Sequence, residues 1–343
     1  MMRAYKLMTR IAINGFGRIG RHALKAALTH EDLQVVAIND LTDTKTLAHL
    51  LRHDTVYGPF EGEVVAQEKA LVVNGTSIRV TAEKDPTLLP WKELNVDVVL
   101  ECTGRFTNLE GASAHIKAGA KRVIISAPAK GEGVPTHVLG VNQKGAGKKD
   151  LVINNASCTT NCIAPPMAIL EEVFGVSRAM MTTVHSYTAS QVLQDAPAKD
   201  LREARAAAQN IVPTTTGAAI ATTQVLPGLK GIFDGLSVRV PTPVVSLSDI
   251  TVLLKKKTSV EEINATFKKA AKSARWKGIL EVTEEPLVSS DFIGNPASSI
   301  VDLSLTRVIA GDFVKIVVWY DNEWGYANRL IEMASEVGKN LKK

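Results

Sequence analysis

Two cysteines lie four residues apart in the stretch NASCTTNC, residues 155–162, although the chain of 343 residues has only three cysteines. The stretch stands between an apolar run, DLVINN, and an apolar helical pattern, CIAPPMAILEEVF, so we expect a turn from a strand into a helix. Cys158 would then begin the helix, where the helix dipole and the free N–H groups favour a thiolate. Cys162 would lie inside the helix on the same side.

The cysteine pair has two interpretations: a redox pair, or one nucleophile with one packing cysteine. Redox pairs usually have the shorter C-x-x-C spacing. A histidine, His185, is predicted at the end of the strand RAMMTTVHSYT, where it could activate a nucleophile. The spacing therefore favours Cys158 as a nucleophile with His185 as its base. The alternative for His185 taken alone is a histidine that packs in the core.

A glycine-rich turn near the N-terminus joins a short apolar strand, residues 11–13, to an amphipathic helix. Gly15, Gly17 and Gly20 would permit a tight turn, close approach of a pyrophosphate and close helix–strand packing. The helix N-terminus would present free N–H groups to the phosphates. The next strand, LQVVAIND, ends at Asp40, where a carboxylate can accept hydrogen bonds from ribose hydroxyls. We therefore predict a dinucleotide site; the alternative for Asp40 is a cap of the following helix.

Two further strands, predicted at residues 96–104 and 121–129, are separated by a helix-like segment. Strands and helices in this alternating order imply a parallel, doubly wound sheet that binds its ligand at the C-terminal ends of the strands. Four residues at such ends are candidate cofactor contacts: Thr103, Gly104, Phe106 and Ser126.

The second half of the chain has a different pattern, with long alternating strands such as GLSVRVPTPVVSLSDITVLLKK and DFVKIVVWYDNEWGYANR. We therefore expect an α/β protein of two domains. Residues 1–157 would form a Rossmann-type domain with a doubly wound parallel sheet, and residues 158–322 a mostly antiparallel α+β catalytic domain. A C-terminal helix, about residues 323–343, could pack back onto the first domain.

A thiolate beside a nicotinamide has a specific use. Its attack on an aldehyde gives a hemithioacetal, hydride transfer leaves a thioester, and a second nucleophile releases the acyl group. His185 could polarise the thiol and move the proton. Thr216 and Gly217, in PTTTGAA, are predicted at a helix N-terminus, and Arg239 offers a bidentate guanidinium, so phosphates are expected as substrate groups. The alternative for this threonine run is a capped helix.

The composition excludes several other classes of protein. The formal charge of +5 and the pI of about 9.0 mildly favour anionic ligands, but the densest basic run, LLKKKTS, has no interleaved aromatics, so nucleic acid is not indicated. No run reaches the roughly 18 apolar residues of a membrane span. An odd number of cysteines favours reduced thiols in the cytoplasm. No metal site is expected, because the histidines do not have the spacing of metal ligands. His49 and His53 lie one helical turn apart, but in an amphipathic stretch. The sequence does not decide whether Met1 or Met8 is the natural start of the protein.

Six motifs together resemble the glyceraldehyde-3-phosphate dehydrogenase family, of the phosphorylating, glycolytic type: INGFGRIGR, NASCTTNC, TTVHSYT, PTTTGAA, RVPTP and WYDNEWGY. They occur in order from about residue 10 to the C-terminus. The resemblance implies oxidation of glyceraldehyde 3-phosphate to 1,3-bisphosphoglycerate, with NAD as cofactor and inorganic phosphate as second substrate. It also implies a homotetramer.

The resemblance assigns roles to individual residues. Cys158 would be the nucleophile and His185 its base, whereas Cys162 would not be catalytic. Ser157 and Thr159 flank the thiol. The substrate-phosphate site would contain Thr188 and Arg239, and the inorganic-phosphate site Thr216 and Gly217. The remaining cofactor contacts would be Gly15, Phe16, Gly17, Arg18, Ile19, Gly20, Asp40, Lys84, Thr103, Gly104, Phe106, Ser126, Asn322 and Tyr326.

Four positions bear on the choice between NAD and NADP. Asp40 would repel a 2′-phosphate and so favours NAD. Lys84 could approach a 2′-phosphate, and Ala196 is smaller than the leucine common in NAD-specific relatives, whereas Pro197 is of the NAD type. We expect NAD to be preferred, with measurable NADP activity.

The long segment 186–210 has no clear secondary structure, which is typical of a functional loop or of one covered by a partner. In the family it resembles the loop that reaches the neighbouring subunit's cofactor site. Glu203 departs from the arginine of many bacterial relatives. The competing hypotheses are an erythrose-4-phosphate dehydrogenase, and a non-catalytic dinucleotide-sensing or nucleic-acid-binding protein. The sequence leaves the physiological direction and any secondary binding role open.

Overall fold

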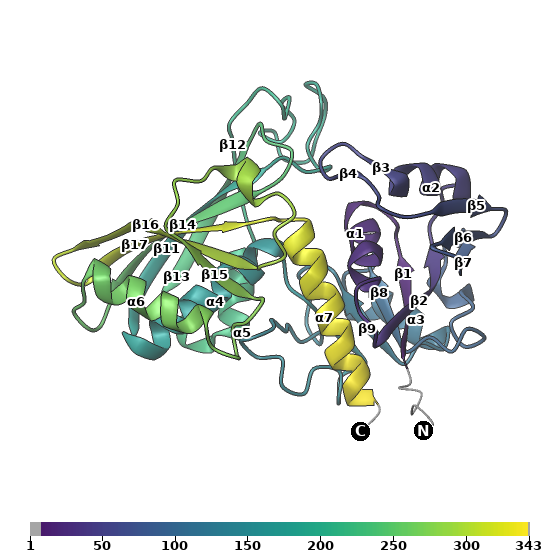
Figure 1. Ribbon diagram of the computed structural model, residues 1–343, viewed down its shortest axis with the longest axis horizontal. Helices are drawn as coiled ribbons and strands as arrows, with labels where there is room; N and C mark the ends of the chain where they lie inside the picture. Colours follow the sequence, from purple (N-terminus) through teal and green to yellow (C-terminus); the bar gives the residue numbers. More distant parts are fainter. Residues whose placement is uncertain (1–7, 342–343) are drawn as a thin grey trace. The chain divides into compact units, whose positions relative to one another are not determined.

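The computed structural model describes residues 8–341 and divides into two compact units (Figure 1). The first unit contains the chain up to residue 137, residues 143–156 and the chain from residue 327. The second contains residues 138–142 and 157–326. The break after residue 156 lies beside the boundary that the sequence suggested at 157. In the described part of the chain, no helix has both the length and the apolar character needed to cross a membrane.

The first unit is built on an eight-stranded sheet whose strand order is β10-β9-β8-β1-β2-β7-β6-β5. The six strands from β10 to β7 run parallel, and β5 and β6 add an antiparallel edge. The predicted doubly wound α/β fold is therefore confirmed. The strands are β1 (Thr9–Asn14), β2 (Leu33–Asn39), β5 (Val64–Gln67), β6 (Ala70–Val73), β7 (Thr76–Thr81), β8 (Val98–Glu101), β9 (Arg122–Ile125) and β10 (Val152–Asn154).

Four helices accompany this sheet: α1 (Arg18–Ala27), α2 (Thr44–Arg52), α3 (Leu109–Lys117) and most of α7 (Trp324–Leu341). Two short strands, β3 (His53–Asp54) and β4 (Gly58–Pro59), form a separate hairpin. The central strands are almost fully apolar, and Ile11, Ala12 and Ile13 of β1 are 0% exposed. Parallel strands covered on both faces have such continuous apolar runs because neither face meets water.

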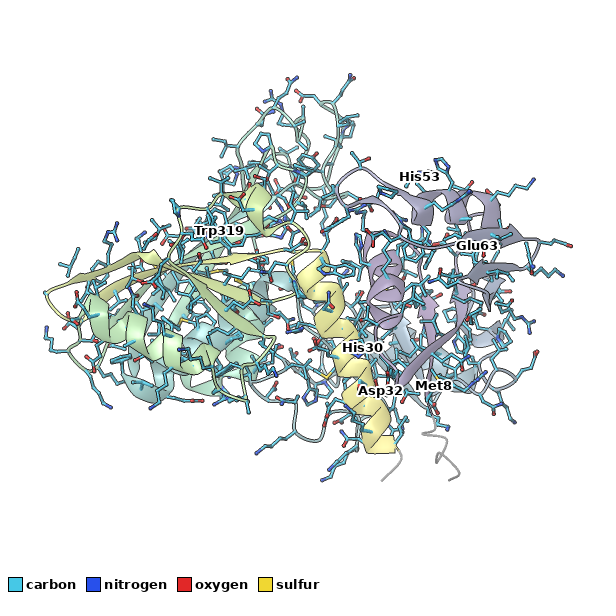
Figure 2. The ribbon with its side chains drawn as sticks, viewed as in Figure 1. Met8, His30, Asp32, His53, Glu63 and Trp319 are labelled. Atoms are coloured by element: carbon cyan, nitrogen blue, oxygen red, sulfur yellow. The ribbon has the colours of Figure 1, made fainter. Side chains whose placement is uncertain are left out.

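Helix α7 packs on the first unit from residue 327 onward. Figure 2 shows Asp32 and His30 beside this helix. The Ser335 hydroxyl donates to Asp32 Oδ2 at 2.5 Å, and Lys339 Nζ lies 3.8 Å from the same oxygen. The hydrogen bond from Ser335 and the charge of Lys339 outweigh the effect of burial and lower the pKa of Asp32. The end of the chain is thus held to the beginning of β2.

The second unit is built on a seven-stranded sheet in the order β12-β13-β11-β14-β17-β16-β15. Its neighbours are antiparallel except for the pairs β11–β13 and β15–β16, as expected for a mostly antiparallel domain. The strands are β11 (Val176–Ser186), β12 (Val212–Thr214), β13 (Phe233–Val240), β14 (Ser246–Leu254), β15 (Leu280–Thr283), β16 (Ser299–Ile309) and β17 (Phe313–Tyr320).

Three helices cover one face of this second sheet: α4 (Cys158–Val173), α5 (Ala218–Val225) and α6 (Val260–Ala271) (Figure 1). Residues alternate along β11, so that Ala179, Met181, Thr183 and His185 are buried. Side chains two residues apart point to the same face of a strand. His185 is therefore on the buried face of the sheet, against which α4 packs.

Helix α4 contains two consecutive prolines, Pro165 and Pro166, in its interior. Proline has no N–H, so the carbonyls of Asn161 and Cys162 lose their usual helical donors. The Ser299 hydroxyl of β16 lies 2.6 Å from the Cys162 carbonyl oxygen and 3.5 Å from that of Asn161. A side chain from the sheet thus replaces the missing donor and ties the helix to the strand.

Candidate active site

The first turn of α4 places Cys158 as the first residue of the helix. Ser157 is the N-cap, and its hydroxyl oxygen accepts a hydrogen bond from the Thr160 N–H at 3.0 Å. Ala156, just before the cap, has a φ of 54°, in the left-handed region that non-glycine residues rarely adopt. Its N–H donates to Asn154 Oδ1 at 3.0 Å, which holds the sharp turn from β10 into α4.

Cys158 and Cys162 have different surroundings. Cys158 Sγ lies 3.5 Å from His185 Nε2, whereas Cys162 is 0% exposed and its Sγ lies 3.8 Å from the carbonyl oxygen of Val318. Burial raises the pKa of the Cys162 thiol well above its usual value. All three cysteines are free thiols. The geometry thus supports one reactive cysteine and one packing cysteine over a redox pair.

Burial also raises the pKa of Cys158, and this effect exceeds the opposing influence of the Arg239 guanidinium and of the hydrogen bonds from Thr159. From the sequence, we expect the helix N-terminus to favour the thiolate. The structure adds an opposing influence, because the loss of water around the sulfur disfavours the thiolate. A thiol whose pKa is raised by burial needs a base within reach, and His185 is the base nearest to its sulfur.

His185 is held by its two strand neighbours. Its Nδ1 lies 2.7 Å from the Ser186 carbonyl oxygen and 2.6 Å from Arg239 Nη1. The contact with Arg239 follows from the parallel register of β11 and β13, which pairs His185 with Arg239. Burial lowers the pKa of His185 to about 4, and the Arg239 charge lowers it further. His185 is therefore a neutral base at physiological pH.

Tyr320 is a site residue that the sequence analysis missed. Its hydroxyl lies 2.9 Å from Thr159 Oγ1 and 2.9 Å from Thr183 Oγ1, so it links α4, β11 and β17. Its ring packs edge-on to that of His185, with 6.1 Å between centroids. The signal was present, because Tyr320 belongs to the motif WYDNEWGY.

Asn322 follows β17 and is held in one orientation. Its Oδ1 accepts hydrogen bonds from the hydroxyls of Ser186, at 3.0 Å, and Ser246, at 3.1 Å. This arrangement leaves the amide N–H groups of Asn322 to donate to another group. Tyr326 is 4% exposed in the first turn of α7.

The candidate phosphate residues lie on three segments of the second unit. Arg239 Nε is buried and has no hydrogen-bond partner among the described residues. Thr188 Oγ1 lies 3.0 Å from Ser190 Oγ, just beyond the end of β11. Thr216 Oγ1 accepts from the Ala218 N–H at 3.1 Å, and Gly217, the N-cap of α5, provides no side-chain cap. The structure thus brings Arg239 to His185 and Cys158, and keeps Thr188, Thr216 and Gly217 at strand and helix ends.

The glycine turn of the first unit has room only for glycine at two positions. Gly15 has a φ of 92°, and a Cβ there would lie 2.8 Å from Thr103 N. A Cβ on Gly20 would collide with the Gly15 carbonyl oxygen, whereas Gly17 has open space around it. Gly17 is the N-cap of α1 and leaves the helix N-terminus without a side-chain cap. This arrangement fits a pyrophosphate at the start of the helix.

Asp40 is bound to this turn. Its Oδ2 accepts from the Phe16 N–H at 2.8 Å and its Oδ1 from the Thr42 N–H at 3.0 Å. It does not cap the next helix, because Asp43 is the N-cap of α2. Lys84 is exposed. Arg18 donates from Nη1 to Asp54 Oδ2 at 2.6 Å, and the following residue, Ile19, lies within the first turn of α1.

A buried polar network below this turn was also missed by the sequence analysis. The carboxylate of Glu101, at the end of β8, accepts from Asn14 Nδ2 at 2.6 Å and from the Thr103 N–H at 2.8 Å, and lies 3.1 Å from His115 Nε2. Trp91 Nε1 donates to His115 Nδ1 at 3.0 Å, which fixes the imidazole as the Nε2–H tautomer. The network orders Thr103 beside the glycine turn.

The other cofactor candidates lie at the same strand ends. Gly104 has a φ of 71°, the Phe106 ring lies edge-on to that of His115, and the Ser126 N–H donates to the Glu101 carbonyl oxygen at 3.0 Å. His49 and His53 are exposed, with 4.8 Å between their ring centroids (His53 is labelled in Figure 2). Among residues 8–341 no cluster of three or more histidine, cysteine or acidic side chains could hold a metal ion.

The fold and the site define a class of protein: a two-domain oxidoreductase that uses a nicotinamide dinucleotide. Comparison with known proteins gives the family. The model described as glyceraldehyde 3-phosphate dehydrogenase, NAD binding domain, matches residues 9–109, and the corresponding C-terminal domain model matches residues 157–322. The chain belongs to the glyceraldehyde-3-phosphate dehydrogenase family.

Curated relatives agree over nearly the whole chain. Glyceraldehyde-3-phosphate dehydrogenase of Geobacillus stearothermophilus is 55% identical over 96% of this chain and 98% of its own length. The Streptomyces coelicolor protein of the same name is 53% identical over 97% of this chain and 99% of its own. A chloroplastic glyceraldehyde-3-phosphate dehydrogenase of Arabidopsis thaliana is 50% identical over 97% and 84%. The predicted family, activity and NAD cofactor are thereby confirmed.

Proposed function

We propose that this enzyme oxidises glyceraldehyde 3-phosphate to 1,3-bisphosphoglycerate with Cys158 as the acyl-carrying nucleophile, His185 as its base and inorganic phosphate as the second substrate. The observation that carries the proposal is the contact of 3.5 Å between Cys158 Sγ and His185 Nε2 at the N-terminus of α4. Family membership supports the activity, and this geometry supports the residue roles.

The chemistry follows from these two side chains. His185 Nε2 takes the proton of Cys158 as the sulfur attacks the aldehyde carbon, and the proton then passes to the carbonyl oxygen to give a hemithioacetal. NAD, held by the residues of the first unit, would supply the acceptor for the hydride of the hemithioacetal carbon. His185 takes the hydroxyl proton in the same step, which leaves a thioester. A phosphate oxygen then attacks the thioester carbon. The C–S bond breaks, which releases the acyl phosphate and regenerates the thiolate of Cys158.

NAD is expected to be held by the residues of the first unit that fit it: the glycine turn of residues 15–20, Asp40, and the strand-end residues Thr103 and Phe106. The uncapped N-terminus of α1 suits a pyrophosphate, and the Asp40 carboxylate suits ribose hydroxyls. Asn322, whose amide orientation is fixed by Ser186 and Ser246, is the expected partner of the nicotinamide amide.

The substrate phosphate is expected at Arg239 and Thr188, and inorganic phosphate at Thr216 and Gly217. A buried guanidinium N–H without a partner, as at Arg239 Nε, carries a free-energy cost that an anion would remove. The start of α5 supplies free N–H groups for a second anion. Glu203 accepts a hydrogen bond at 3.1 Å from Oγ1 of Thr214, which lies two residues before Thr216. Its carboxylate cannot itself bind phosphate.

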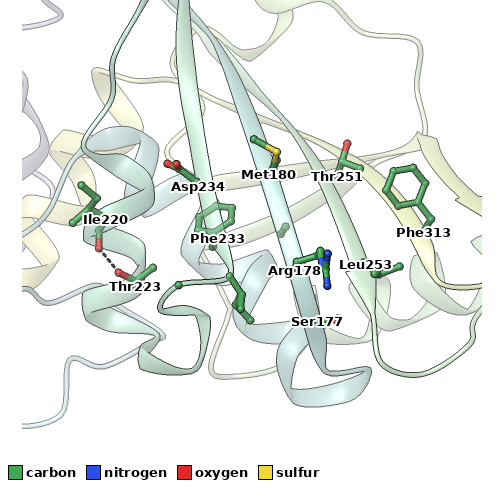
Figure 3. Close-up of a pocket in the computed structure, with 13 residues that line it drawn as sticks. Ser177, Arg178, Met180, Ile220, Thr223, Phe233, Asp234, Thr251, Leu253 and Phe313 are labelled. Atoms are coloured by element: carbon green, nitrogen blue, oxygen red, sulfur yellow. Dashed lines mark hydrogen bonds between the residues drawn. The ribbon is translucent and has the colours of Figure 1, made fainter.

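We also propose a homotetramer, as the family resemblance implies. Among the described residues, one face of the second sheet is not covered by helices, and it borders a groove of about 1070 Å³ that apolar and polar side chains line together (Figure 3). Met180 is 67% exposed there, Ile220 66% and Phe313 45%. Exposed apolar patches of this kind mark protein–protein contacts. We further propose a cytoplasmic location, because all three cysteines are free thiols.

A steady-state assay with glyceraldehyde 3-phosphate, NAD and phosphate tests the function. Cys158→Ser should abolish NADH formation while NAD binding, measured by calorimetry, stays nearly unchanged. Cys162→Ser is the matched control, one helical turn away, and should retain most of the turnover. Loss of activity in both variants would favour the redox pair, and loss in Cys162→Ser alone would reverse the assignment.

A further inference from the structure

Glu101, at the end of β8, is a buried acid that the proposed reaction does not use. It is 1% exposed, and its carboxylate meets four polar groups: Oε1 faces the N–H and the hydroxyl of Thr103, and Oε2 faces Asn14 Nδ2 and His115 Nε2. A buried carboxylate is costly unless hydrogen bonds satisfy its oxygens. The direction of these four contacts therefore decides which form of Glu101 fits the site.

The contact from Asn14 has a fixed direction. The backbone of Glu83 orients the amide of Asn39, because its N–H donates to Oδ1 at 2.9 Å and its carbonyl oxygen accepts from Nδ2 at 2.9 Å. Asn39 Nδ2 also donates to Asn14 Oδ1 at 2.7 Å. The amide of Asn14 must then turn its Nδ2 towards Glu101, so this contact is a donor.

The contacts from His115 and Thr103 are donors as well. Trp91 Nε1 donates to His115 Nδ1 at 3.0 Å, which leaves a neutral ring with its proton on Nε2, towards Glu101. The Thr103 hydroxyl oxygen accepts from the Arg105 N–H at 3.0 Å, so its own proton can go to Glu101. All four groups thus donate. The ionised carboxylate fits them, whereas a protonated one would place an O–H against a donor.

The carboxylate joins the two turns that meet at the expected cofactor site. Asn14 directly precedes Gly15 of the glycine turn, and its carbonyl oxygen accepts from the Cys102 N–H at 2.8 Å. A Cβ on Gly15 would lie 2.8 Å from Thr103 N, so the two turns are in contact. Glu101 holds the first turn through Asn14 and the second through Thr103.

We propose that Glu101 is a positioning residue for the dinucleotide: its carboxylate is the shared acceptor that fixes the two turns at the separation that receives the cofactor. This inference rests on the proposed NAD site of the first unit. The four donors occupy the carboxylate, so Glu101 acts through the turns and does not itself contact the cofactor. The property that matters is one acceptor-only group between the turns, whether position 101 or position 14 carries it.

Glu101→Gln keeps the shape of the side chain and replaces one oxygen by an NH2 group. That group would face a donor on either side, from Thr103 or from Asn14 and His115. In the free variant the turns can move apart to relieve the mismatch, and NAD would have to bring them back. We expect the Kd for NAD, measured by calorimetry, to rise roughly tenfold, as for one unsatisfied buried group.

Steady-state kinetics separates positioning from a purely structural role. In Glu101→Gln the KM for NAD should rise, while kcat at saturating NAD stays near the wild-type value. A residue that only stabilises the fold would change the amount of active enzyme, and so lower kcat with KM unchanged. That second pattern would overturn the proposal.

The double variant Asn14→Asp with Glu101→Gln moves the carboxylate to the other turn. At position 14 it can accept from Asn39 Nδ2 and from the new amide, whose carbonyl oxygen can still accept from Thr103. His115 Nε2 lies 3.4 Å from Asn14 Nδ2, so its proton can also reach the moved carboxylate. The double variant should bind NAD within about threefold of the wild type. Asn14→Asp alone should bind NAD more weakly, because two carboxylates would face each other.

Asp40→Ala is the control for the site itself and should weaken NAD binding. Unchanged binding in Asp40→Ala would reject the proposed NAD site, whereas weaker binding there with an unchanged Kd in Glu101→Gln would reject this inference alone. Circular dichroism checks that each variant folds. If Glu101→Gln does not fold, the double variant decides. A double variant that does not fold, or that binds NAD at least tenfold more weakly than the wild type, would overturn the proposal.

Discussion

His185 has a lowered pKa and lies close to the thiol of Cys158, and both properties come from its position on β11. The buried face of the strand removes water from the ring, and the parallel register brings Arg239 beside it. The same burial raises the pKa of Cys158. Burial thus disfavours the charged form of each group, and we expect proton transfer between them to accompany attack on the substrate.

The shifted pKa of His185 predicts how stability depends on pH. Its value of about 4 lies below the roughly 6.5 of an unfolded chain, so the unfolded state binds more protons as the pH falls. The stability from the neutral ring is therefore complete above about pH 6.5 and is lost as the pH falls towards 4. The shift corresponds to about 3 kcal/mol over this window.

Urea unfolding at pH 7 and pH 4.5 measures this effect. The wild type should lose about 2 to 3 kcal/mol more than His185→Asn between the two pH values. His53→Asn, at an exposed histidine, is the control and should follow the wild type. Equal losses in all three proteins would show that His185 is not a buried neutral base.

At the level of elements, the start of α4 connects the backbone to the chemistry. Ser157 caps the helix and Cys158 follows it, so loss of the cap should both weaken the helix and disturb the thiol. Ser259, the N-cap of α6, makes the equivalent hydrogen bond to the Glu262 N–H at 3.3 Å and belongs to no proposed site. The two serines form a matched pair.

We expect Ser157→Ala and Ser259→Ala each to lower the free energy of unfolding by about 1 kcal/mol, the usual effect of losing a serine cap. Only Ser157→Ala should also lower kcat/KM and slow the alkylation of Cys158 by iodoacetamide. Chemical denaturation and a steady-state assay give the two quantities. Equal kcat/KM values for the two variants would separate the cap from the catalytic thiol.

The secondary structure of the site could be predicted because its signals are local. The glycine turn, the strand ending at Asp40 and the helix starting at Cys158 each have a pattern within about 20 residues. The motif WYDNEWGY marks Tyr320, but the contacts of Tyr320 and of the Glu101–His115 pair could not be predicted, because each depends on which distant segments the sheet brings together. The hydroxyl of Ser299 that replaces the donors lost at Pro165 and Pro166 is another example.

For the whole molecule, the uncovered face of the second sheet carries the proposal of a tetramer. Met180 and Leu88 are both well exposed, at 67% and 69%, but of the two only Met180 lines the groove of the second sheet. A lysine in a desolvated contact would be costly, because the charge would lose its water without gaining a partner. The two positions can therefore be compared directly.

Light scattering coupled to size exclusion should give the mass of four chains for the wild type and for Leu88→Lys. Met180→Lys should give a smaller assembly with its secondary structure retained by circular dichroism. A wild type of one chain would reject the tetramer. A tetramer that survives Met180→Lys would place the interface elsewhere.

The central claim is that Cys158 carries the acyl group between oxidation and phosphate attack. A single-turnover experiment tests it: enzyme and NAD are mixed with excess glyceraldehyde 3-phosphate without phosphate, quenched in acid, and digested for mass spectrometry. We predict a burst of NADH equal to the active sites, with the acyl group on the peptide that contains residue 158. Cys162→Ser should give the same burst, and the added mass should disappear when phosphate is supplied before the quench. A full burst from Cys158→Ser, or an acyl group found on another residue, would contradict the account.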